Sequence, residues 1–193
     1  MWNQGSRKSK LWSLLTLIVI VYLLSIVSTK INGQSTPSAS NLAPGYYKVS
    51  RFVDGDTISI DMNGKTEKVR FIGVDTPETH KPNTPVQCYG PAAADFTKNT
   101  LGQQKVRLEA DPLSTNRDKY NRLLRYVYLP DGTNLNAKLI STGNGFYYPY
   151  FPFQKSSEFS SLQNQAKAKN KGLWGNCSPT QNERGGYTSN VAS

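Results

Sequence analysis

Short apolar or alternating runs, separated by turn residues, fill much of the chain from Gly45 onward. Runs of this length bounded by Gly, Asn, Asp and Pro are typical of β-strands. They predict five strands, at Tyr46–Phe52, Thr57–Met62, Lys68–Val74, Lys105–Ala110 and Leu123–Tyr128. Asn63-Gly64 is a strong hairpin signal between the second and third runs, and Asp131-Gly132 marks a turn after the fifth.

Longer stretches with helical character interrupt and follow these strands. Pro91 suits the first turn of a helix, and Gly172 suits a C-terminal cap. The helices are predicted at Pro91–Leu101, Asn134–Thr142 and Ser157–Lys171. Five short strands with inserted and appended helices predict an α+β, β-rich domain built on a small five-stranded β-barrel with three helices.

The N-terminus has the layout of a signal peptide or a signal anchor. Arg7, Lys8 and Lys10 precede an apolar run at 11–27, which is short for a membrane span and long for a cleaved signal peptide. No convincing cleavage site follows, which favours an uncleaved anchor, and cleavage stays open as the alternative. The positive-inside rule places residues 1–10 in the cytoplasm and the rest outside, or secreted if the segment is cleaved.

Polar, turn-rich composition marks the two segments that flank the domain. Residues 28–44 are rich in Ser, Thr, Asn and Pro, and they predict a flexible linker. Residues 45–177 hold the strands and helices and form one predicted domain. The tail at 178–193 is equally polar, and it is predicted to be disordered.

The amino-acid composition narrows the binding partners, metal sites and reaction types that the protein can have. The 193 residues contain 23 Lys and Arg against 13 Asp and Glu, a net charge of +10 that attracts polyanions such as nucleic acid and would also suit anionic lipid. His80 is the only histidine and there are two cysteines, which argues against His-rich or four-thiolate zinc sites and a two-histidine ribonuclease mechanism. The ligands of any catalytic metal must therefore be mainly oxygens.

Two acidic motifs and two arginines supply suitable groups. Asp54-Gly55-Asp56-Thr57 and Asp75-Thr76-Pro77-Glu78 each follow a predicted strand, where carboxylates can converge on a hard cation such as Ca²⁺ or Mg²⁺. Either motif alone is also ordinary turn chemistry. Arg70 and Arg122 offer planar, bidentate grips on a phosphate, although each alone would also suit a surface position.

Taken together, these motifs resemble the signatures of the thermonuclease (staphylococcal-nuclease-like) family. The segments similar to the family are, in order, Asp54–Thr57, Val69–Glu78, Tyr89–Pro91, Asp118–Leu123 and Gly172–Trp174. They extend over nearly the whole domain. In the fourth segment a glycine commonly occupies the position of Asn121, and Asn tolerates the left-handed backbone that such a position can require.

The resemblance implies an OB-type five-stranded barrel with three helices, in agreement with the pattern of runs. It further implies calcium-dependent hydrolysis of phosphodiester bonds in DNA and RNA, with little sequence specificity and 3′-phosphate ends. Calcium would be bound by the carboxylates of Asp56 and Asp75 and by the backbone carbonyl of Thr76.

The same resemblance implies catalytic roles for three further residues. Arg70 and Arg122 would hold the scissile phosphate, and Glu78 would be the general base or the group that orients the attacking water. Because no member of this set is missing, the sequence favours an enzyme. The alternative is a catalytically inactive, membrane-tethered module that binds nucleic acid.

Aromatic and basic residues near these motifs predict the remaining contacts. Lys119, Tyr120, Tyr148 and Tyr150 are candidates for binding single-stranded or frayed substrate, by charge and by sequence-tolerant stacking, with core packing as the alternative for the last two. A monomer is expected. If the domain is exported, Cys88 and Cys177 are candidates for a disulfide, and two unrelated thiols are the alternative.

Overall fold

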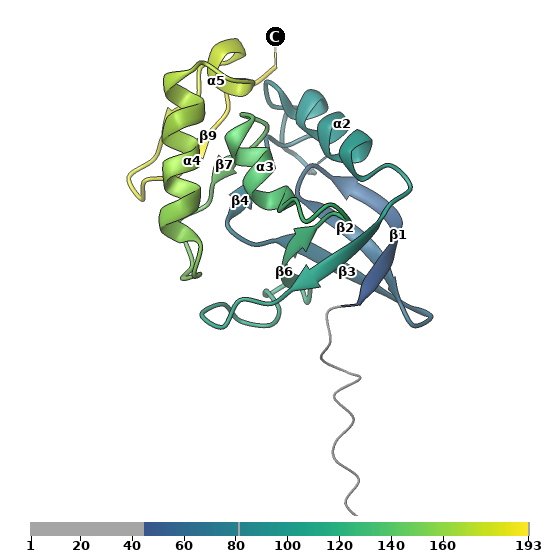
Figure 1. Cartoon of the computed structure of the whole chain (residues 1–193). Helices are drawn as coiled ribbons and strands as arrows, with labels where there is room; N and C mark the ends of the chain where they lie inside the picture. Colours follow the sequence, from purple (N-terminus) through teal and green to yellow (C-terminus); the bar gives the residue numbers. More distant parts are fainter. Residues whose placement is uncertain (1–44, 81, 193) are drawn as a thin grey trace, which may run out of the picture. The chain divides into compact units, whose positions relative to one another are not determined.

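Five β-strands form the centre of the molecule. The computed structural model describes residues 45–80 and 82–192. The barrel contains β1 (Tyr46–Asp54), β2 (Thr57–Met62), β3 (Lys65–Phe71), β5 (Lys105–Glu109) and β6 (Leu123–Tyr128). It closes in the order β1-β2-β3-β6-β5, with β3 and β6 parallel and every other pair antiparallel (Figure 1). The predicted five-stranded barrel is confirmed.

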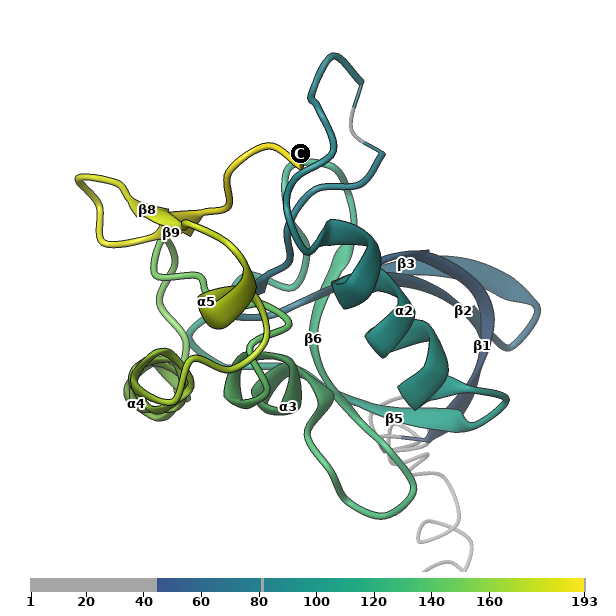
Figure 2. The ribbon, with the colours of Figure 1, turned by 90° about the horizontal axis from the view of Figure 1, so that it is seen from above.

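The three predicted helices are also present. They are α2 (Gly90–Leu101), α3 (Leu135–Ser141) and α4 (Ser156–Ala168). Seen from above, α2 lies over one end of the barrel, while α3 and α4 lie side by side next to it (Figure 2). The Thr97 hydroxyl of α2 donates a 2.7 Å hydrogen bond to the carbonyl of Gly55, which fixes the helix on the β1–β2 turn.

The hydrophobic core fills the barrel and continues under α3 and α4. Among the barrel residues, Ile58, Ile60 and Val69 are completely buried. Between β6 and α4, Tyr126 and Phe159 pack edge to face with ring centroids 6.1 Å apart. This packing holds the helices firmly against the strands that carry the polar site residues.

The third strand differs from its prediction. It was expected at Lys68–Val74, whereas β3 ends at Phe71 and the chain turns at Gly73, where φ is +70°. A Cβ at residue 73 would lie 2.4 Å from the ring of Phe153, so both the backbone angle and the space require glycine. After this turn, β4 (Val74–Asp75) pairs with β7 (Phe146–Tyr147) outside the barrel.

The end of the last long helix also differs. The prediction that Gly172 caps it is wrong, because α4 ends at Ala168 and Gly172 instead precedes a short helix, α5 (Leu173–Asn176). A Cβ on Gly172 would lie 2.2 Å from the carbonyl oxygen of Gly143. Gly172 is therefore required for a close approach of two backbones, which sequence spacing does not reveal.

The polar C-terminal segment is ordered where disorder was expected. β8 (Thr180–Gln181) and β9 (Tyr187–Thr188) form an antiparallel hairpin. The ring of Tyr187 stacks on Phe146 at 6.1 Å between centroids and meets Trp174 edge to face at 5.0 Å. One aromatic anchor therefore orders a segment whose composition predicts disorder.

A disulfide joins Cys88 and Cys177, which are 89 residues apart in sequence. It links the start of α2 to the residue after α5. The segments expected at 1–10, 11–27 and 28–44 lie outside the described residues. Within the described part, no helix is both long and apolar enough to span a bilayer.

Candidate functional site

The first acidic motif places Asp56 in the turn immediately before β2, where it contacts the second motif. Asp56 is buried, and its Oδ2 accepts hydrogen bonds from the backbone N–H of Thr76 at 2.9 Å and from the Thr76 hydroxyl at 3.2 Å. Glycine is required at residue 55, because a Cβ there would lie 2.6 Å from the Thr76 hydroxyl oxygen. The two acidic motifs of the sequence therefore meet at one place.

Arg70 of β3 bridges these motifs with a guanidinium that is almost completely buried. Its Nε lies 3.1 Å from Asp56 Oδ1, and its Nη2 lies 2.8 Å from Asp75 Oδ1. Its Nη1 donates to the carbonyls of Phe71 at 2.9 Å and Val74 at 2.5 Å. Burial by itself lowers the pKa of Arg70, but the neighbouring carboxylates outweigh it and raise the pKa above its ordinary value. The guanidinium is therefore charged and fixed in orientation.

A third carboxyl group, that of Asp54, lies close to Asp56. Burial, and then the charge of Asp56, raise the pKa of Asp54 to about 7. Asp54 Oδ1 also accepts the backbone N–H of Asp56 at 3.1 Å. Crowded carboxyl groups of this kind favour a bound cation.

The donors at this place fit a hard metal ion. Asp56, Asp75 and the carbonyl of Thr76 offer only oxygen, which is the preference of Ca²⁺. In residues 45–80 and 82–192, no group of three or more His, Cys, Asp or Glu side chains is arranged to hold a metal. An ion here would therefore take its remaining ligands from backbone carbonyls and water.

Glu78 lies beyond β4, at the start of the loop that leads to α2. Its Oε1 accepts the backbone N–H groups of Thr79 at 3.2 Å and His80 at 3.3 Å. Its backbone is held on both sides by Gln87, whose Oε1 accepts the Glu78 N–H at 2.8 Å and whose N–H donates to the Glu78 carbonyl at 2.9 Å. Gln87 fixes the base of this loop, and no motif in the sequence indicated it.

Arg122 is held by a tight turn immediately before β6. Asp118 Oδ2 lies 2.7 Å from both Nε and Nη2 of Arg122, and Asp118 Oδ1 accepts the backbone N–H groups of Tyr120 and Arg122, each at 2.9 Å. Asn121 has φ of +62°, the left-handed conformation considered for it from the sequence. Asparagine therefore meets the backbone requirement of this turn.

One cleft of about 670 Å³ is lined by five of the predicted site residues, and the predicted metal ligands and Glu78 are not in its lining. Arg70, Arg122, Lys119, Tyr120 and Tyr148 all line it. Tyr120 is 68% exposed, and the cations of Lys119 and Arg122 lie 5.0 Å and 5.3 Å from its ring centroid. Arg70 lies 5.8 Å from the ring centroid of Tyr148. The cleft thus combines the guanidinium groups of Arg70 and Arg122 with aromatic rings.

Tyr150 does not line this cleft. Its hydroxyl contacts the side-chain amide of Asn182 and lies over Gly186, both of the C-terminal hairpin. Its ring lines a neighbouring pocket of about 540 Å³. Tyr150 therefore lies next to the cleft, between the neighbouring pocket and the C-terminal hairpin.

Several residues that the sequence analysis did not single out also line the cleft, and three of them have large side chains that are exposed or charged. They are Leu113, Arg117 and Phe151. Arg117 is also paired with Glu67 at 2.8 Å and donates to the carbonyl of Asn121 at 2.9 Å, which braces the turn before Arg122. For Phe151, the available signal in the sequence was an aromatic residue directly before a proline, Pro152.

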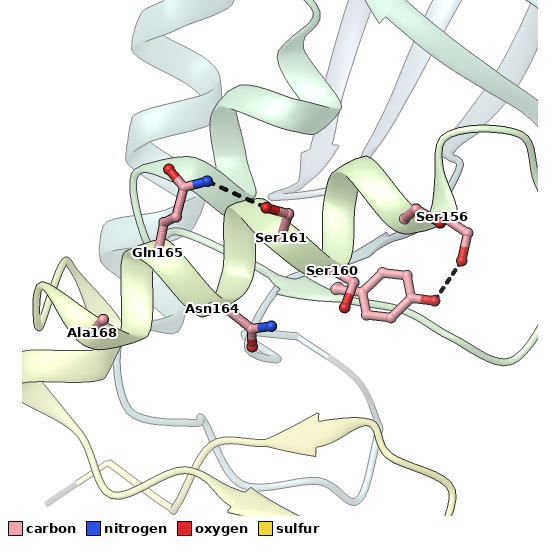
Figure 3. Close-up of a pocket in the computed structure, with 8 residues that line it drawn as sticks. Ser156, Ser160, Ser161, Asn164, Gln165 and Ala168 are labelled. Carbon is pink, nitrogen blue, oxygen red and sulfur yellow. Dashed lines mark hydrogen bonds between the residues drawn. The ribbon is translucent and has the colours of Figure 1, made fainter.

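A second cavity of similar size lies on the outer face of α4, away from these groups. Its volume is about 700 Å³, and Figure 3 shows that serine, asparagine and glutamine side chains surround it. Gln165 donates to the hydroxyl of Ser161 at 3.3 Å, and the Tyr147 and Ser156 hydroxyls share a 2.6 Å hydrogen bond. Because no charged side chain lines this cavity, we place the functional site in the cleft of Arg70 and Arg122.

Comparisons with known proteins identify the family of the chain. The family described as staphylococcal nuclease homologue matches residues 68–176. The chain is 44% identical over 168 residues to a thermonuclease of Staphylococcus hyicus, covering 83% of this chain and 96% of the relative. It is 43% identical over 163 residues to a thermonuclease of Staphylococcus intermedius, covering 82% and 94%. Over 128 residues it is 41% identical to the endonuclease YncB of Bacillus subtilis (strain 168), covering 65% and 60%. The chain therefore belongs to the staphylococcal nuclease family.

Proposed function

We propose that this protein is a calcium-dependent nuclease that hydrolyses phosphodiester bonds in DNA and RNA with little sequence specificity and leaves 3′-phosphate ends. The observation that carries the proposal is that Arg70 and Arg122 line one cleft, while Arg70 is also paired with the carboxylates of Asp56 and Asp75. Its relatives are named thermonucleases and endonucleases.

The guanidinium groups account for stabilisation of the transition state. Attack on a phosphodiester builds negative charge on the phosphoryl oxygens, and arginine donors fixed beforehand stabilise that charge without reorganising. Arg70 is fixed by carboxylates and carbonyls, and Arg122 by Asp118. Calcium bound by Asp56, Asp75 and the Thr76 carbonyl would add positive charge beside the same phosphate.

Glu78 is the candidate for accepting or steering a proton of the attacking water. Its two hydrogen bonds to backbone N–H groups measure 3.2 Å and 3.3 Å, at the long end of the usual range. Such weak bonds leave the carboxylate able to turn toward a water. The clamp by Gln87 holds the backbone of Glu78 while its side chain turns.

The proposed substrates follow from the chemistry of the cleft. Its arginines bind phosphates, which DNA and RNA share. Because no proposed step requires a 2′-hydroxyl, both can be substrates. The rings of Tyr120 and Tyr148 suit stacking with any base, which gives little sequence preference and favours unpaired strands.

The proposed location is outside the cytoplasm. The protein would be a monomer, tethered through residues 11–27 or secreted if that segment is cleaved. The disulfide of Cys88 and Cys177 supports this location, because such bonds persist in oxidising compartments.

A nuclease assay on the full chain tests the proposal. Single-stranded DNA, duplex DNA and RNA are incubated with calcium or with a chelator, and the ends of the products are identified by phosphatase and kinase labelling. We expect calcium-dependent cleavage, a loss of about 10²–10³-fold in kcat for Arg122→Ala, and a clear loss for Glu78→Gln. Arg51→Ala removes an exposed charge of β1 that does not line the cleft, and it serves as the control.

Two results would count against the nuclease. Binding of nucleic acid without cleavage under any divalent ion would indicate the tethered binding module. If the Arg122→Ala and Glu78→Gln variants each cleave as fast as the Arg51→Ala control, the roles assigned to Arg122 and Glu78 are refuted.

A further inference from the structure

The C-terminal hairpin forms a second pocket directly beside the cleft. This hairpin pocket has a volume of about 540 Å³ and is lined by Tyr148, Tyr150, Phe151, Asn182, Glu183 and Arg184. Tyr148 and Phe151 line both the hairpin pocket and the cleft. The two hollows therefore share a wall made by these two rings.

The tip of the hairpin is held in place against the domain. Asn182 accepts the backbone N–H groups of Arg184 at 3.0 Å and Gly186 at 3.2 Å through its Oδ1, while its amide contacts the hydroxyl of Tyr150. Tyr187, packed on Phe146, anchors the other strand of the hairpin. Arg184 is thus carried on a braced turn.

Arg184 differs from the arginines of the cleft in having no partner. In the portion of the chain that the structure describes, its guanidinium makes no hydrogen bond, ion pair or ring contact, whereas Arg70, Arg117 and Arg122 are each paired with a carboxylate. A guanidinium without a partner keeps its full capacity to bind a phosphate in a bidentate manner. Glu183 lines the same pocket and opposes a phosphate there.

The apolar wall of the hairpin pocket suits a base. Phe151 is 60% exposed, and its ring lies 5.8 Å from that of Tyr148, which meets Tyr150 edge to face at 4.5 Å. Exposed aromatic faces next to a cation are the combination that binds unpaired strands without regard to sequence. The hairpin lies beyond residue 176, the last residue that the family model matches.

We propose that the hairpin pocket is an additional subsite for single-stranded nucleic acid, in which Arg184 binds a phosphate and Phe151 stacks with a base of the nucleotides adjacent to those in the cleft. The proposal rests on the nuclease function proposed above. It assigns the hairpin to retention of long substrates, and it leaves the chemical step to the cleft.

Binding measurements on the full chain separate this subsite from the cleft. Fluorescence anisotropy with a labelled oligothymidylate and a thymidine dinucleotide, in chelator to prevent cleavage, gives the Kd over a range of salt concentrations. We expect Arg184→Ala to weaken binding of the long strand about three- to tenfold and to lower the slope of log K against log salt by about one, with the dinucleotide unaffected. Arg184→Lys should keep most of the affinity, and Glu183→Gln should raise it.

The matched control is Arg51→Ala, which removes the same charge from an exposed position on β1. If Arg184→Ala and Arg51→Ala bind the long strand equally, the subsite is overturned, whether or not the wild type cleaves. Wild-type chain that binds in this pattern but never cleaves with calcium overturns the nuclease function and supports the subsite. Wild-type chain that neither binds nor cleaves overturns both.

Discussion

Each of the two arginines assigned to the phosphate depends on an acidic neighbour for its orientation. Asp118 uses all of its acceptor capacity in one turn: Oδ1 accepts two backbone N–H groups and Oδ2 contacts the guanidinium of Arg122. Burial raises the pKa of Asp118, but its hydrogen bonds and ion pair with Arg122 outweigh this and hold the pKa below its ordinary value. An ionised Asp118 therefore fixes Arg122 before substrate arrives.

Replacing Asp118 with Asn tests this positioning. The amide keeps the acceptor for the two N–H groups but puts a donor opposite the guanidinium, so Arg122 loses its fixed orientation. We expect kcat to fall about tenfold with a small change in Tm, because positioned donors contribute to the transition state more than to the fold. Glu158→Gln, which breaks the 3.5 Å pair with Lys155 on α4, is the control for loss of one negative charge. Equal rates for Asp118→Asn and Glu158→Gln would contradict the positioning role.

Asp111 is the residue on which the cleft wall depends for stability. Its carboxylate is buried and accepts the Tyr126 hydroxyl at 2.6 Å and the backbone N–H groups of Gln154 and Leu113, each at 2.8 Å. Burial raises the pKa of Asp111, but the hydrogen bonds, led by that from Tyr126, outweigh it and keep the pKa below the ordinary value.

Because the pKa of Asp111 is lower in the folded state, its contribution to stability is present above pH of about 4 and is lost as pH falls through the folded-state pKa. Asp111→Asn places an N–H donor against the N–H of Gln154, so at pH 7 we expect a loss of about 1–3 kcal/mol in the free energy of unfolding by urea. The difference from wild type should shrink at acid pH. Asp95→Asn, at an exposed position of α2, is the control, and a difference that is constant from pH 7 to pH 3 would refute the account.

At the scale of elements, the turn between β3 and β4 decides where the acidic groups lie. β3 stays in the barrel up to Phe71, and Gly73 then sends Val74 and Asp75 out to pair with β7. Without this turn, the strand would continue in the barrel and Asp75 would not meet Arg70. The site is therefore assembled by a break in a strand.

Two glycines with positive φ allow the cost of backbone strain to be separated from the cost of a steric clash at the added Cβ. Gly73 has φ of +70° and a Cβ there would lie 2.4 Å from Phe153, whereas Gly64 has φ of +84° and nothing within 4 Å. We expect Gly64→Ala to cost about 1 kcal/mol from the backbone alone and Gly73→Ala to cost about 2–4 kcal/mol, because overpacking adds to it. Chemical denaturation of both variants measures the difference. Equal losses of stability in the two variants would contradict the prediction, because they would show that the Phe153 ring moves aside without cost.

At the scale of the whole domain, the C-terminal segment is fastened to the loop that carries Glu78. The disulfide joins Cys88 to Cys177, and beyond it the backbone N–H of Cys88 donates to the carbonyl of Asn190 at 2.7 Å. The Ser189 hydroxyl donates to the carbonyl of Cys88 at 2.9 Å. One covalent and several polar links therefore close the domain around the base of α2.

Loss of the disulfide should destabilise the folded domain. A bond between residues 89 apart restricts the unfolded chain strongly, and such bonds contribute about 2–4 kcal/mol. We expect the double variant Cys88→Ser and Cys177→Ser to lose this amount in urea unfolding. In reductant, the wild type should have the same free energy of unfolding as the double variant. Reductant should not change the stability of the double variant itself. Equal stability of the oxidised and reduced wild type would contradict the prediction.

Local patterns in the sequence determined most of the framework. Alternating runs and the Asn63-Gly64 turn predicted the five strands, because side-chain period and turn chemistry act over a few residues. The acidic motifs, the two arginines and the family resemblance gave the residues of the candidate site. The positive net charge and the single histidine also narrowed the possible substrates to polyanions and the possible metal ligands to oxygens.

Tertiary structure alone decided how distant segments meet. The bond from Thr76 to Asp56 spans 20 residues, and that from Ser189 to Cys88 spans 101, so neither is encoded in a local pattern. The hairpin pocket, the clamp of Gln87 on Glu78 and the contact of Tyr150 with the tail arise in the same way. Residues of ordinary local character acquire these roles because close packing of the whole chain brings their polar atoms and rings together.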